Sequence, residues 1–578
     1  MEDFLIGKKN GVLINFSKKY CTSSTELLES VDFKKILELY LKKISKKDTD
    51  VYKHLSKQFG KKHELTNNLI HFLKLLVVFD LNDAAKYYSE CLITKKDLLL
   101  AFIEDFYDFW RSFERYAMIV NKHKAAFQQS NFFYALDDFN NLILSTYRKI
   151  EETLMLSKNK VYRQLNAGIN VGMIVEKINW RVPIEYEELL KIPFIKMVVL
   201  QPPFFVYTKQ NTRKGMFQEI SENPLCGLEF NAGEWLCYPI KIGSLLAFVY
   251  FHSDFMAQGI TLSNLFELAT EAECRERKPD LMVIFGAKDG VATPRCSFYR
   301  DRKNDLIIGY LNHNEGIDYF GYMKKMILTV FNLKMIELGN LPIHGAMVNI
   351  TLKSGKALNV VLMGDSGAGK SESLEAFRIL AEEYVKEMKV IFDDMGYLTL
   401  RNGKVCGYGT EIGAFVRLDD LSKDYAYKAM ERSIFLNPDR INARVVMPIS
   451  TFEIVNAGYP VDYFLYANNY EDHQELEFFN SQDDAKKIFV AGTRIAKGTT
   501  NEVGIVHSYF ANPFGPAQMQ ESTDQLIDKY FSEMFNGNVV LGQIRTRLGI
   551  AGFEQEGPLM AAKKLLDLFL GLVVRRGI

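Results

Sequence analysis

The chain has 578 residues, of which 48% are hydrophobic and 25% are charged. Lysine plus arginine and aspartate plus glutamate each number 71, so the formal net charge is zero. This balance excludes recruitment of nucleic acid or of an anionic membrane by the field of the whole molecule. The length exceeds what one core ordinarily serves and favours two or three domains.

Targeting and redox signals point to the cytoplasm. The first residues, MEDFLIGKKNGVL, have acids where a signal peptide needs positive charge. No run reaches the roughly 18 apolar residues of a membrane span, because Asp80 interrupts Leu75–Leu81 and LLDLFLGLVV near the C-terminus is too short. The seven cysteines form no CxxC pair, which argues for reduced thiols and against a zinc ribbon. We expect a cytoplasmic protein without membrane or nucleic-acid partners.

Residues 1–165 are predicted to be helical throughout. Segments such as SVDFKKILELYLKKI and TNNLIHFLKLLVVF repeat apolar residues at three- and four-residue spacing. Proline is absent from this stretch. A helical accessory or scaffold domain is the main interpretation, and docking of a protein partner is the alternative.

Residues 166–330 are predicted to form a mixed α/β domain. Short β-branched and aromatic runs (FIKMVVLQ, LLAFVYFH, LMVIFGA and DLIIGYL) alternate there with Pro, Gly and Asn turns. From residue 331 to 578, strands and helices alternate around a glycine-rich loop. The predicted fold class is therefore α/β, with an all-helical N-terminal extension, a mixed α/β middle domain and a C-terminal nucleotide-binding domain.

The glycine-rich loop is a phosphate-binding motif. The segment GDSGAGKS fits the pattern G-x-x-x-x-G-K-[ST], between an apolar strand (LNVVLM) and an amphipathic helix (SESLEAFRILAEEYVKEM). Its glycines let backbone N–H groups turn onto phosphate oxygens at the helix N-terminus. We expect Lys370 to reach the β- and γ-phosphates and the Ser371 hydroxyl to coordinate Mg²⁺. The predicted ATP-binding residues are Gly364, Asp365, Ser366, Gly367, Ala368, Gly369, Lys370 and Ser371.

A second group of metal ligands is predicted on the next strand. The segment KVIFDDMGY is read as an apolar strand that ends in Asp393 and Asp394. One of the two carboxylates would hold the cation directly or through water.

The segment LPIHGAMVNI, with His344, precedes the loop. A histidine just upstream of such a loop resembles two families, the phosphoenolpyruvate carboxykinases and the HPr kinase/phosphorylases. The string HGAMVNI…GDSGAGKSES…DD is at least as similar to the HPr kinase pattern as to the carboxykinase pattern. Longer-range features favour the ATP-using carboxykinases.

The segment YFGYMKKMILTVFNLKMIELGNLPIHGA resembles the carboxykinase sequence Y-x-G-E-M-K-K-x-x-F followed by an apolar helix and Met-His. His344 follows Lys325 by 19 positions (344 − 325), as in that family. The resemblance implies that Lys325, His344 and Asp394 hold Mn²⁺. A buried lysine beside a cation has a depressed pKa and a free lone pair, so this chemistry is plausible. Lys324 is expected to be the solvated neighbour of Lys325.

Two further segments resemble the family. RINARVVMPISTFEIVNAGYP matches its N-T/A-R-x-x-Y-P-I segment, which implies that Arg444 neutralises the transferring γ-phosphate. FVAGTRIAKGTTNEVGIVHSYFANPFGP resembles the mobile lid and the sequence after it, so Arg494 and Lys497 are expected near nucleotide phosphates or in water. The segment GTEIGAFVRL occupies the place of the family's E-G-G-C-Y-A-K, with Arg417 where the family has a lysine.

The substrate side departs from the family. Tyr322 replaces the Glu before Met-Lys-Lys, the lid is one residue longer, and YANNYEDHQELEFF replaces D-A-F-G-V-L-P-P. Arg163 and Arg213 are both candidates for the arginine that binds the substrate carboxylate. His313, His473 and His507 match no motif position and are expected in loops or at the surface.

The resemblance covers residues 315–560 and implies a metal-dependent enzyme that converts oxaloacetate and ATP into phosphoenolpyruvate, ADP and CO₂. Its site would lie in a cleft between the last two domains, with the lid closing on ATP. The alternative keeps the fold and ATP but transfers the phosphoryl group to a hydroxyl of a small molecule or a protein, with Asp393 as the base.

Overall fold

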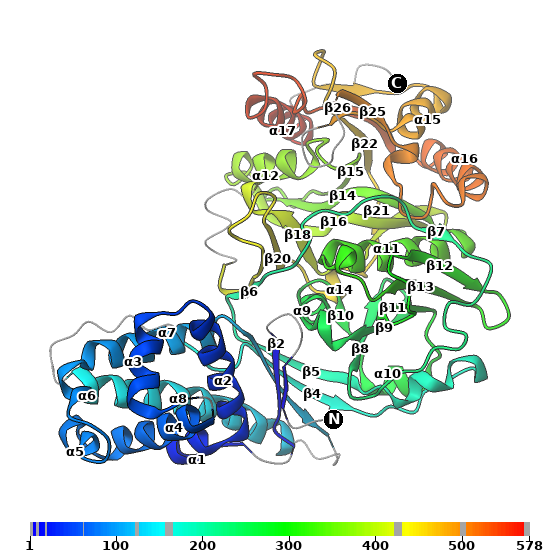
Figure 1. Cartoon of the computed structure of the whole chain (residues 1–578). Helices are drawn as coiled ribbons and strands as arrows, with labels where there is room; N and C mark the ends of the chain where they lie inside the picture. Colours follow the sequence, from blue (N-terminus) through cyan, green and yellow to red (C-terminus); the bar gives the residue numbers. More distant parts are fainter. Residues whose placement is uncertain are drawn as a thin grey trace. The chain divides into compact units, whose positions relative to one another are not determined.

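The computed structural model describes the chain apart from short segments. The described residues are 4–6, 11–17, 20–61, 63–121, 127–155, 166–420, 430–496 and 504–571. Arg163 and Lys497 lie outside them. The chain forms two compact units: an N-terminal unit of residues 1–176 with 195–201, and a C-terminal unit of residues 177–194 with 202–578 (Figure 1).

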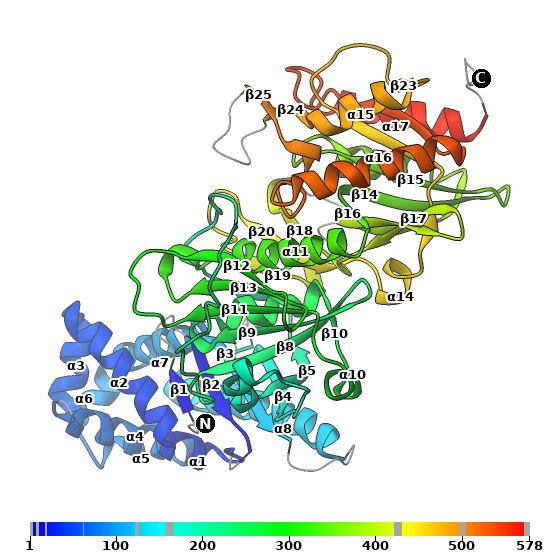
Figure 2. The ribbon, with the colours of Figure 1, turned by 90° about the vertical axis from the view of Figure 1, so that its right-hand side faces the viewer.

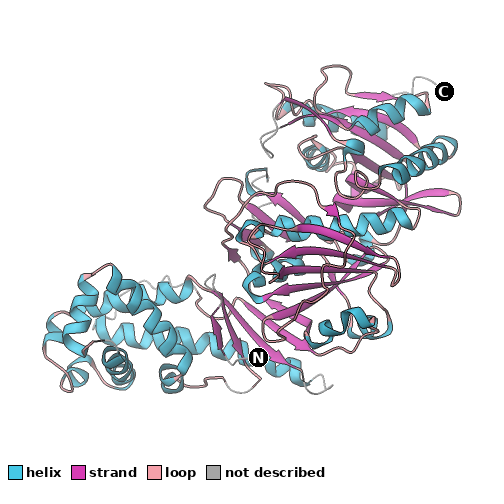
Figure 3. Cartoon of the chain, turned by 45° about the vertical axis from the view of Figure 1, so that its right-hand side comes forward, coloured by secondary structure: helices cyan, strands magenta, loops and turns pink. Residues whose placement is uncertain are grey.

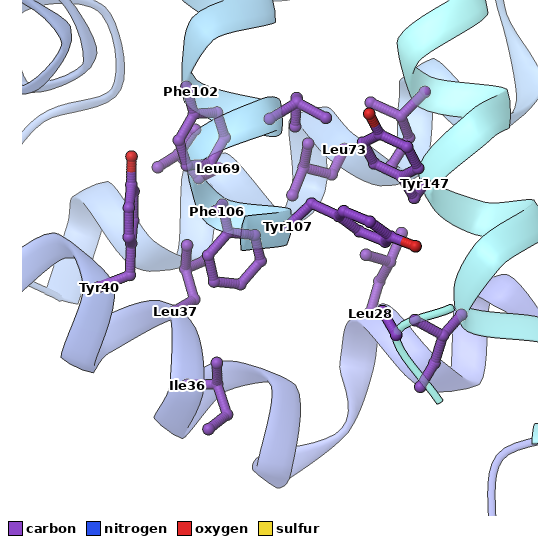
Figure 4. Close-up of a cluster of buried hydrophobic side chains, with 14 of the residues drawn as sticks. Leu28, Ile36, Leu37, Tyr40, Leu69, Leu73, Phe102, Phe106, Tyr107 and Tyr147 are labelled. Atoms are coloured by element: carbon purple, nitrogen blue, oxygen red, sulfur yellow. The ribbon is translucent and has the colours of Figure 1, made fainter. Parts of the chain in front are cut away.

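Helices make up most of the N-terminal unit (Figure 3). They are α1 (Ser24–Glu29), α2 (Val31–Lys46), α3 (Asp50–Phe59), α4 (His63–Val78), α5 (Leu81–Ala85), α6 (Cys91–Thr94), α7 (Lys96–Arg111) and α8 (Phe127–Met155). The side chains of Ser30 and Thr49 accept N–H groups at the starts of α2 and α3. The apolar stripes of the helices meet in one core, where the Tyr107 and Tyr147 rings stack at 3.9 Å between centroids (Figure 4).

The prediction of an all-helical N-terminal region is wrong at three places. β1 (Phe4–Ile6), β2 (Gly11–Asn15) and β3 (Glu114–Val120) are strands. β1 pairs antiparallel with β2, β2 pairs parallel with β3, and β3 pairs parallel with β4 (Val171–Glu176). Each strand is shorter than the window in which helical periodicity is recognised, and the helices α1–α7 separate β2 from its partner β3 in the chain. The pairing of β2 with β3 is therefore long-range and leaves little local signal.

The first sheet of the C-terminal unit follows the order β8 (Trp235–Ile242), β9 (Leu245–His252), β11 (Leu281–Ala287), β13 (Leu306–Asn312) and β12 (Cys296–Asp301). β9, β11 and β13 are parallel to one another. All residues of these three strands are buried, as their continuous apolar runs predict. The buried helix α11 (Phe320–Glu337) lies along this sheet (Figure 2). The predicted boundary between residues 330 and 331 falls inside α11.

The second sheet carries the phosphate loop. Its strand order is β21 (Tyr459–Pro460), β17 (Lys404–Gly409), β16 (Val385–Arg401), β14 (Leu341–Leu352), β15 (Ala357–Met363), β22 (Tyr463–Asn468), β26 (Val540–Arg545) and β23 (Leu476–Phe478). Side chains of β15 alternate between two cores. Val361 and Met363 pack with α15 (Gln482–Ala491) and α16 (Gln520–Asn536), and Val360 and Leu362 pack with α12 (Lys370–Leu380) and α17 (Glu556–Phe569). Helices therefore cover both faces, and the α/β prediction is confirmed.

Two smaller sheets complete this unit. β18 (Gly413–Arg417), β20 (Arg444–Pro448), β19 (Ile434–Leu436) and β6 (Phe204–Val206) form one, and β24 (Thr493–Ala496) with β25 (Gly504–His507) forms the other. No helix among the described residues is long and apolar enough to cross a membrane.

The region after the phosphate loop differs from its prediction. The helix ends at Leu380 rather than Met388, and the next strand begins at Val385. The strand continues to Arg401, so Asp393 and Asp394 lie inside β16 and not at its end. The reason is tertiary: pairing of β16 with β14 along most of its length satisfies the backbone of residues 385–388 as a strand, which overrides their helical pattern.

Candidate active site

The phosphate loop joins β15 to α12, as predicted. Gly367 and Gly369 have positive φ angles of 79° and 90°. A Cβ atom on Gly369 would lie 2.5 Å from Thr546 Oγ1, so only glycine fits both the space and the backbone conformation. Thr546 donates a hydrogen bond to the Ala368 carbonyl at 2.7 Å, and Asn469 donates to the Gly367 carbonyl at 2.9 Å. Side chains that follow β26 and β22 thus fix the loop.

Lys370 and Ser371 open helix α12, where N–H groups and the helix dipole favour an anion. The Lys370 ammonium donates to the Asp365 carbonyl at 3.0 Å. The Ser371 hydroxyl donates to Asp393 at 2.7 Å, and the Ser366 N–H donates to the Asp365 carboxylate at 2.7 Å. Burial raises the pKa of Asp393, although the Ser371 hydrogen bond opposes this shift. The loop lysine, hydroxyl and neighbouring carboxylate therefore have the arrangement expected of a nucleotide site.

Lys325, His344 and Asp394 meet beside the loop. Asp394 accepts a hydrogen bond from Lys325 Nζ at 2.7 Å, and its other oxygen lies 3.0 Å from His344 Nε2. The strand register sets Gly345 opposite Asp394 and Ala346 opposite Asp393, so no large side chain of β14 stands directly across from either carboxylate. Three residues predicted as metal ligands, from α11, β14 and β16, are thus in direct contact.

The His344 ring is oriented by a backbone group. Its Nδ1 lies 2.7 Å from the Ala511 carbonyl, an oxygen that only accepts, so Nδ1 carries the hydrogen. Since a bare Nε2 lone pair cannot hydrogen-bond the Asp394 carboxylate, the 3.0 Å contact requires a second hydrogen on Nε2 or a cation between the two groups. A carbonyl that fixes the tautomer while the other nitrogen points at a carboxylate is the arrangement of a metal-ligating histidine.

Lys324 is a buried member of the cluster and not the solvated neighbour that the sequence predicts. Its side chain is 1% exposed and ion-pairs with Asp394 at 2.7 Å and with Glu411 at 2.9 Å. Burial opposes the Lys324 charge, but these two carboxylates raise its pKa. Burial lowers the pKa of Lys325 despite the contact with Asp394. Burial favours the neutral acid of Asp394, yet Lys324 and Lys325 hold its pKa well below the usual range.

Glu411 gives the cluster a pH dependence. Burial raises the pKa of Glu411 from its usual 4.5 to about 7, while Lys324 opposes the shift. Between these values the folded protein binds a proton that the unfolded chain has released, so this group makes stability fall as pH rises. We expect Glu411→Gln to flatten or reverse that slope, because glutamine does not titrate. Urea unfolding at pH 5, 6 and 7 measures the effect.

Exposed Glu533 on α16 offers the matched control for this experiment. Glu533→Gln should show the same decrease in stability with rising pH as the wild-type protein. Parallel slopes for wild type and Glu411→Gln would contradict the assignment of the proton to Glu411.

Arg494 on β24 contacts the loop. Its Nε donates to Asp365 at 3.0 Å, and Asp365 also lies 3.6 Å from His344 Nδ1. Burial opposes ionisation of Asp365, but His344 and Arg494 lower its pKa. Asp365 therefore links the phosphate loop to His344, and Arg494 lines the loop where the resemblance implies nucleotide phosphates.

Arg444 begins β20 and faces the same cluster. Its guanidinium carbon lies 5.4 Å from the centre of the Phe415 ring, and Lys324 Nζ lies 5.5 Å from that ring. Arg444 Nε is buried, and no hydrogen-bond acceptor for it exists among the described residues. A buried donor without a partner, on a cation that shares the Phe415 ring with Lys324, is suited to an anion. Arg417, also on this sheet, pairs with Asp419 at 3.1 Å.

Of the two candidate carboxylate-binding arginines, Arg213 lies at the site. Its guanidinium carbon is 5.2 Å from the centre of the Phe514 ring, and Lys325 Nζ is 4.5 Å from the same centre. The His344 ring is 6.2 Å from that ring. Arg213, Lys325 and His344 therefore surround one aromatic side chain.

Comparison with models of known protein families and with curated protein sequences found no match for this chain. We therefore infer a function from the site geometry and from the motif resemblance. Sequence reasoning missed Lys324, Glu411, Asn469 and Thr546. The available signal was weak: Glu411 lies in the segment GTEIGAFVRL, and Lys324 is half of a Lys-Lys pair that is usually a solvated helix face.

Proposed function

We propose that this protein is an ATP-dependent phosphoryl-transfer enzyme of the phosphoenolpyruvate carboxykinase type. The observation that carries the proposal is the double contact of Asp394 with Lys325 and His344, next to the phosphate loop. In this reaction the bond from C3 to the departing carboxylate of oxaloacetate breaks and CO₂ leaves. The electron pair forms the enolate, whose oxygen attacks the γ-phosphorus of ATP while ADP departs.

The donor set fits two divalent cations. Three side chains suit Mn²⁺: the His344 imidazole, the Asp394 carboxylate and the Lys325 amine, whose pKa is lowered. The Ser371 hydroxyl and Asp393 are hard oxygen donors that suit Mg²⁺. Bound cations would neutralise charge on the phosphate oxygens and on the substrate oxygen.

Lysine and arginine side chains of the protein would neutralise the remaining negative charge of the two substrates. Lys370 would exchange its hydrogen bond with the Asp365 carbonyl for phosphate oxygens, and Arg444 would present its unpaired Nε–H to the transferring phosphoryl group. Arg213 would hold a substrate carboxylate across the Phe514 ring from Lys325. These residues bind and orient both substrates and need no covalent step of their own.

The test follows ³¹P resonances of the protein with ATP, Mg²⁺, Mn²⁺ and oxaloacetate. We expect phosphoenolpyruvate to form in proportion to ADP. Arg213→Lys should raise KM for oxaloacetate about tenfold or more while KM for ATP stays unchanged, because a point charge replaces a bidentate fork. Arg277→Lys is the matched control, since Arg277 is an exposed arginine that pairs with Asp280. ATP left intact, or converted to ADP and phosphate alone, would refute the carboxykinase reaction.

A kinase of the same fold is the second candidate, and Asp393 favours it. Burial raises the pKa of this carboxyl, which accepts a hydrogen bond from Ser371 and could take a proton from an acceptor hydroxyl. Replacement of the D-A-F-G-V-L-P-P segment favours the same reading. ATP consumption that requires an added hydroxyl compound or protein, and yields its phosphate ester, would establish this function.

A further inference from the structure

A second cluster of metal-binding residue types lies on the first sheet of the C-terminal unit. His252 is the last residue of β9, Asp254 follows in the 3₁₀ turn Ser253–Phe255, and His313 follows the last residue of β13. Because β9, β11 and β13 are parallel, the carboxyl ends of β9 and β13 lie at one edge with β11 between them (Figure 2). Ligands bind in α/β sheets at this edge.

The ligand atoms of these three residues are close together. One Asp254 oxygen lies 2.8 Å from His313 Nε2 and 3.5 Å from His252 Nδ1. One ligand atom from each residue fits within 4.8 Å of the others. Four ligand atoms that bind a metal at about 2.0–2.1 Å in a tetrahedron lie roughly 3.3 Å from one another. The distances of 2.8 Å and 3.5 Å from the Asp254 oxygen lie on either side of this value.

The backbone around the cluster is shaped to bring the two histidines together. Gly286 has a φ angle of 94° at an irregularity of β11. A Cβ atom there would lie 2.7 Å from the Phe255 ring and 3.0 Å from His252 Cβ, so a side chain at this position would displace both. The His313 N–H donates to the Ala287 carbonyl at 2.7 Å, which fixes the start of the segment after β13.

His252 also has a carboxylate beside its second ring nitrogen, as metal-ligating histidines commonly do. Its Nε2 lies 3.2 Å from Glu234, a carboxylate that also pairs with Lys288 at 2.8 Å. Its Nδ1 accepts the Asp254 N–H at 3.1 Å, so the neutral ring carries its hydrogen on Nε2, facing Glu234. His252 is 2% exposed, so the residues packed around it fix the position of its ring.

We propose that His252, Asp254 and His313 bind a divalent transition-metal cation of the Zn²⁺ class, separate from the cations of the phosphate-loop cluster. Two imidazoles and one carboxylate are a donor set that Zn²⁺ accepts with a fourth position open to water. The His313 side chain is 23% exposed, so solvent reaches the site. On binding, His252 Nδ1 exchanges the Asp254 N–H for the cation, and the bound metal ties the end of β9 to the end of β13.

The test titrates the full chain, stripped with a chelator, with Co²⁺ and then Zn²⁺. We expect one equivalent of Co²⁺ to give the intense visible absorption of a four-coordinate N/O site, and Zn²⁺ to displace it. His313→Ala should weaken this binding by about 100-fold or more. His473→Ala replaces an exposed histidine elsewhere and should change nothing. His344→Ala should also retain this equivalent, which separates it from the phosphate-loop cluster.

A chain of hydrogen bonds from Glu234 through His252 and Asp254 to His313, without metal, is the competing explanation. Co²⁺ binding of the same affinity in His313→Ala and in His473→Ala, or the absence of a four-coordinate spectrum in wild type, would overturn the proposal. If His313→Ala does not fold, Asp254→Asn takes its place in the test. This variant keeps the shape of the side chain and removes its charge, so it should also lose the bound equivalent of Co²⁺. Both outcomes are independent of phosphoryl transfer.

Discussion

Asp394→Asn should lower the free energy of unfolding by about 3 kcal/mol, the lower end of the cost of breaking a buried ion pair. The substitution leaves Lys324, which is 1% exposed, with Glu411 as its remaining carboxylate partner among the described residues. The lower figure applies because the Asp394 side chain is itself 23% exposed. Urea unfolding of metal-free protein at pH 7 measures the change.

Two further variants separate the lost charge from a general disturbance. Asp393→Asn alters the neighbouring carboxyl, which accepts a hydrogen bond from Ser371, and should cost less. Asp394→Asn combined with Lys324→Met removes both charges and should recover part of the lost stability. Equal stabilities for Asp393→Asn and Asp394→Asn would show that the Lys324 charge does not depend on Asp394.

Lys370→Ala should reduce the rate of phosphoryl transfer from ATP by about 100- to 1000-fold, the range found for loss of one preorganised charge in a closed site. The residue begins α12 and is 7% exposed, so its ammonium acts in a largely dry environment. Initial rates of ADP formation, with the acceptor that proves active, measure the effect. Lys356→Ala, an exposed lysine just before β15, should keep the wild-type rate. Equal rates for the two variants would show that the loop takes no part in phosphoryl transfer.

The parts of the site that sequence predicts are those whose signal is local. The strand, the glycine turn and the first turn of α12 follow from a contiguous pattern, and the structure confirms this order. His344 and Asp394 were predicted from the order of motifs, and their contact follows from the antiparallel register of β14 and β16. Arg213 remained one of two candidates because its position depends on a loop that packs onto Phe514.

The parts that sequence could not predict are set by long-range contacts. A Lys-Lys pair on a helix usually faces water, and only the burial of α11 on every side turns Lys324 inward. The length of β16 depends on its partner β14 and not on the propensity of residues 385–388. The pairing of β2 with β3, and the meeting of His252 with His313, similarly bring together distant segments of the chain.

Diffraction at the manganese absorption edge, from crystals grown with ADP and Mn²⁺, would show whether Lys325, His344 and Asp394 hold a cation. We predict an anomalous peak bonded to His344 Nε2 and Asp394 and adjacent to Lys325 Nζ, with the ADP phosphates on the loop from Gly364 to Ser371. ADP on the loop without a manganese peak at these three side chains would contradict the account. The cluster would then be an ion-pair network of the fold, and the metal chemistry assigned to it would be wrong.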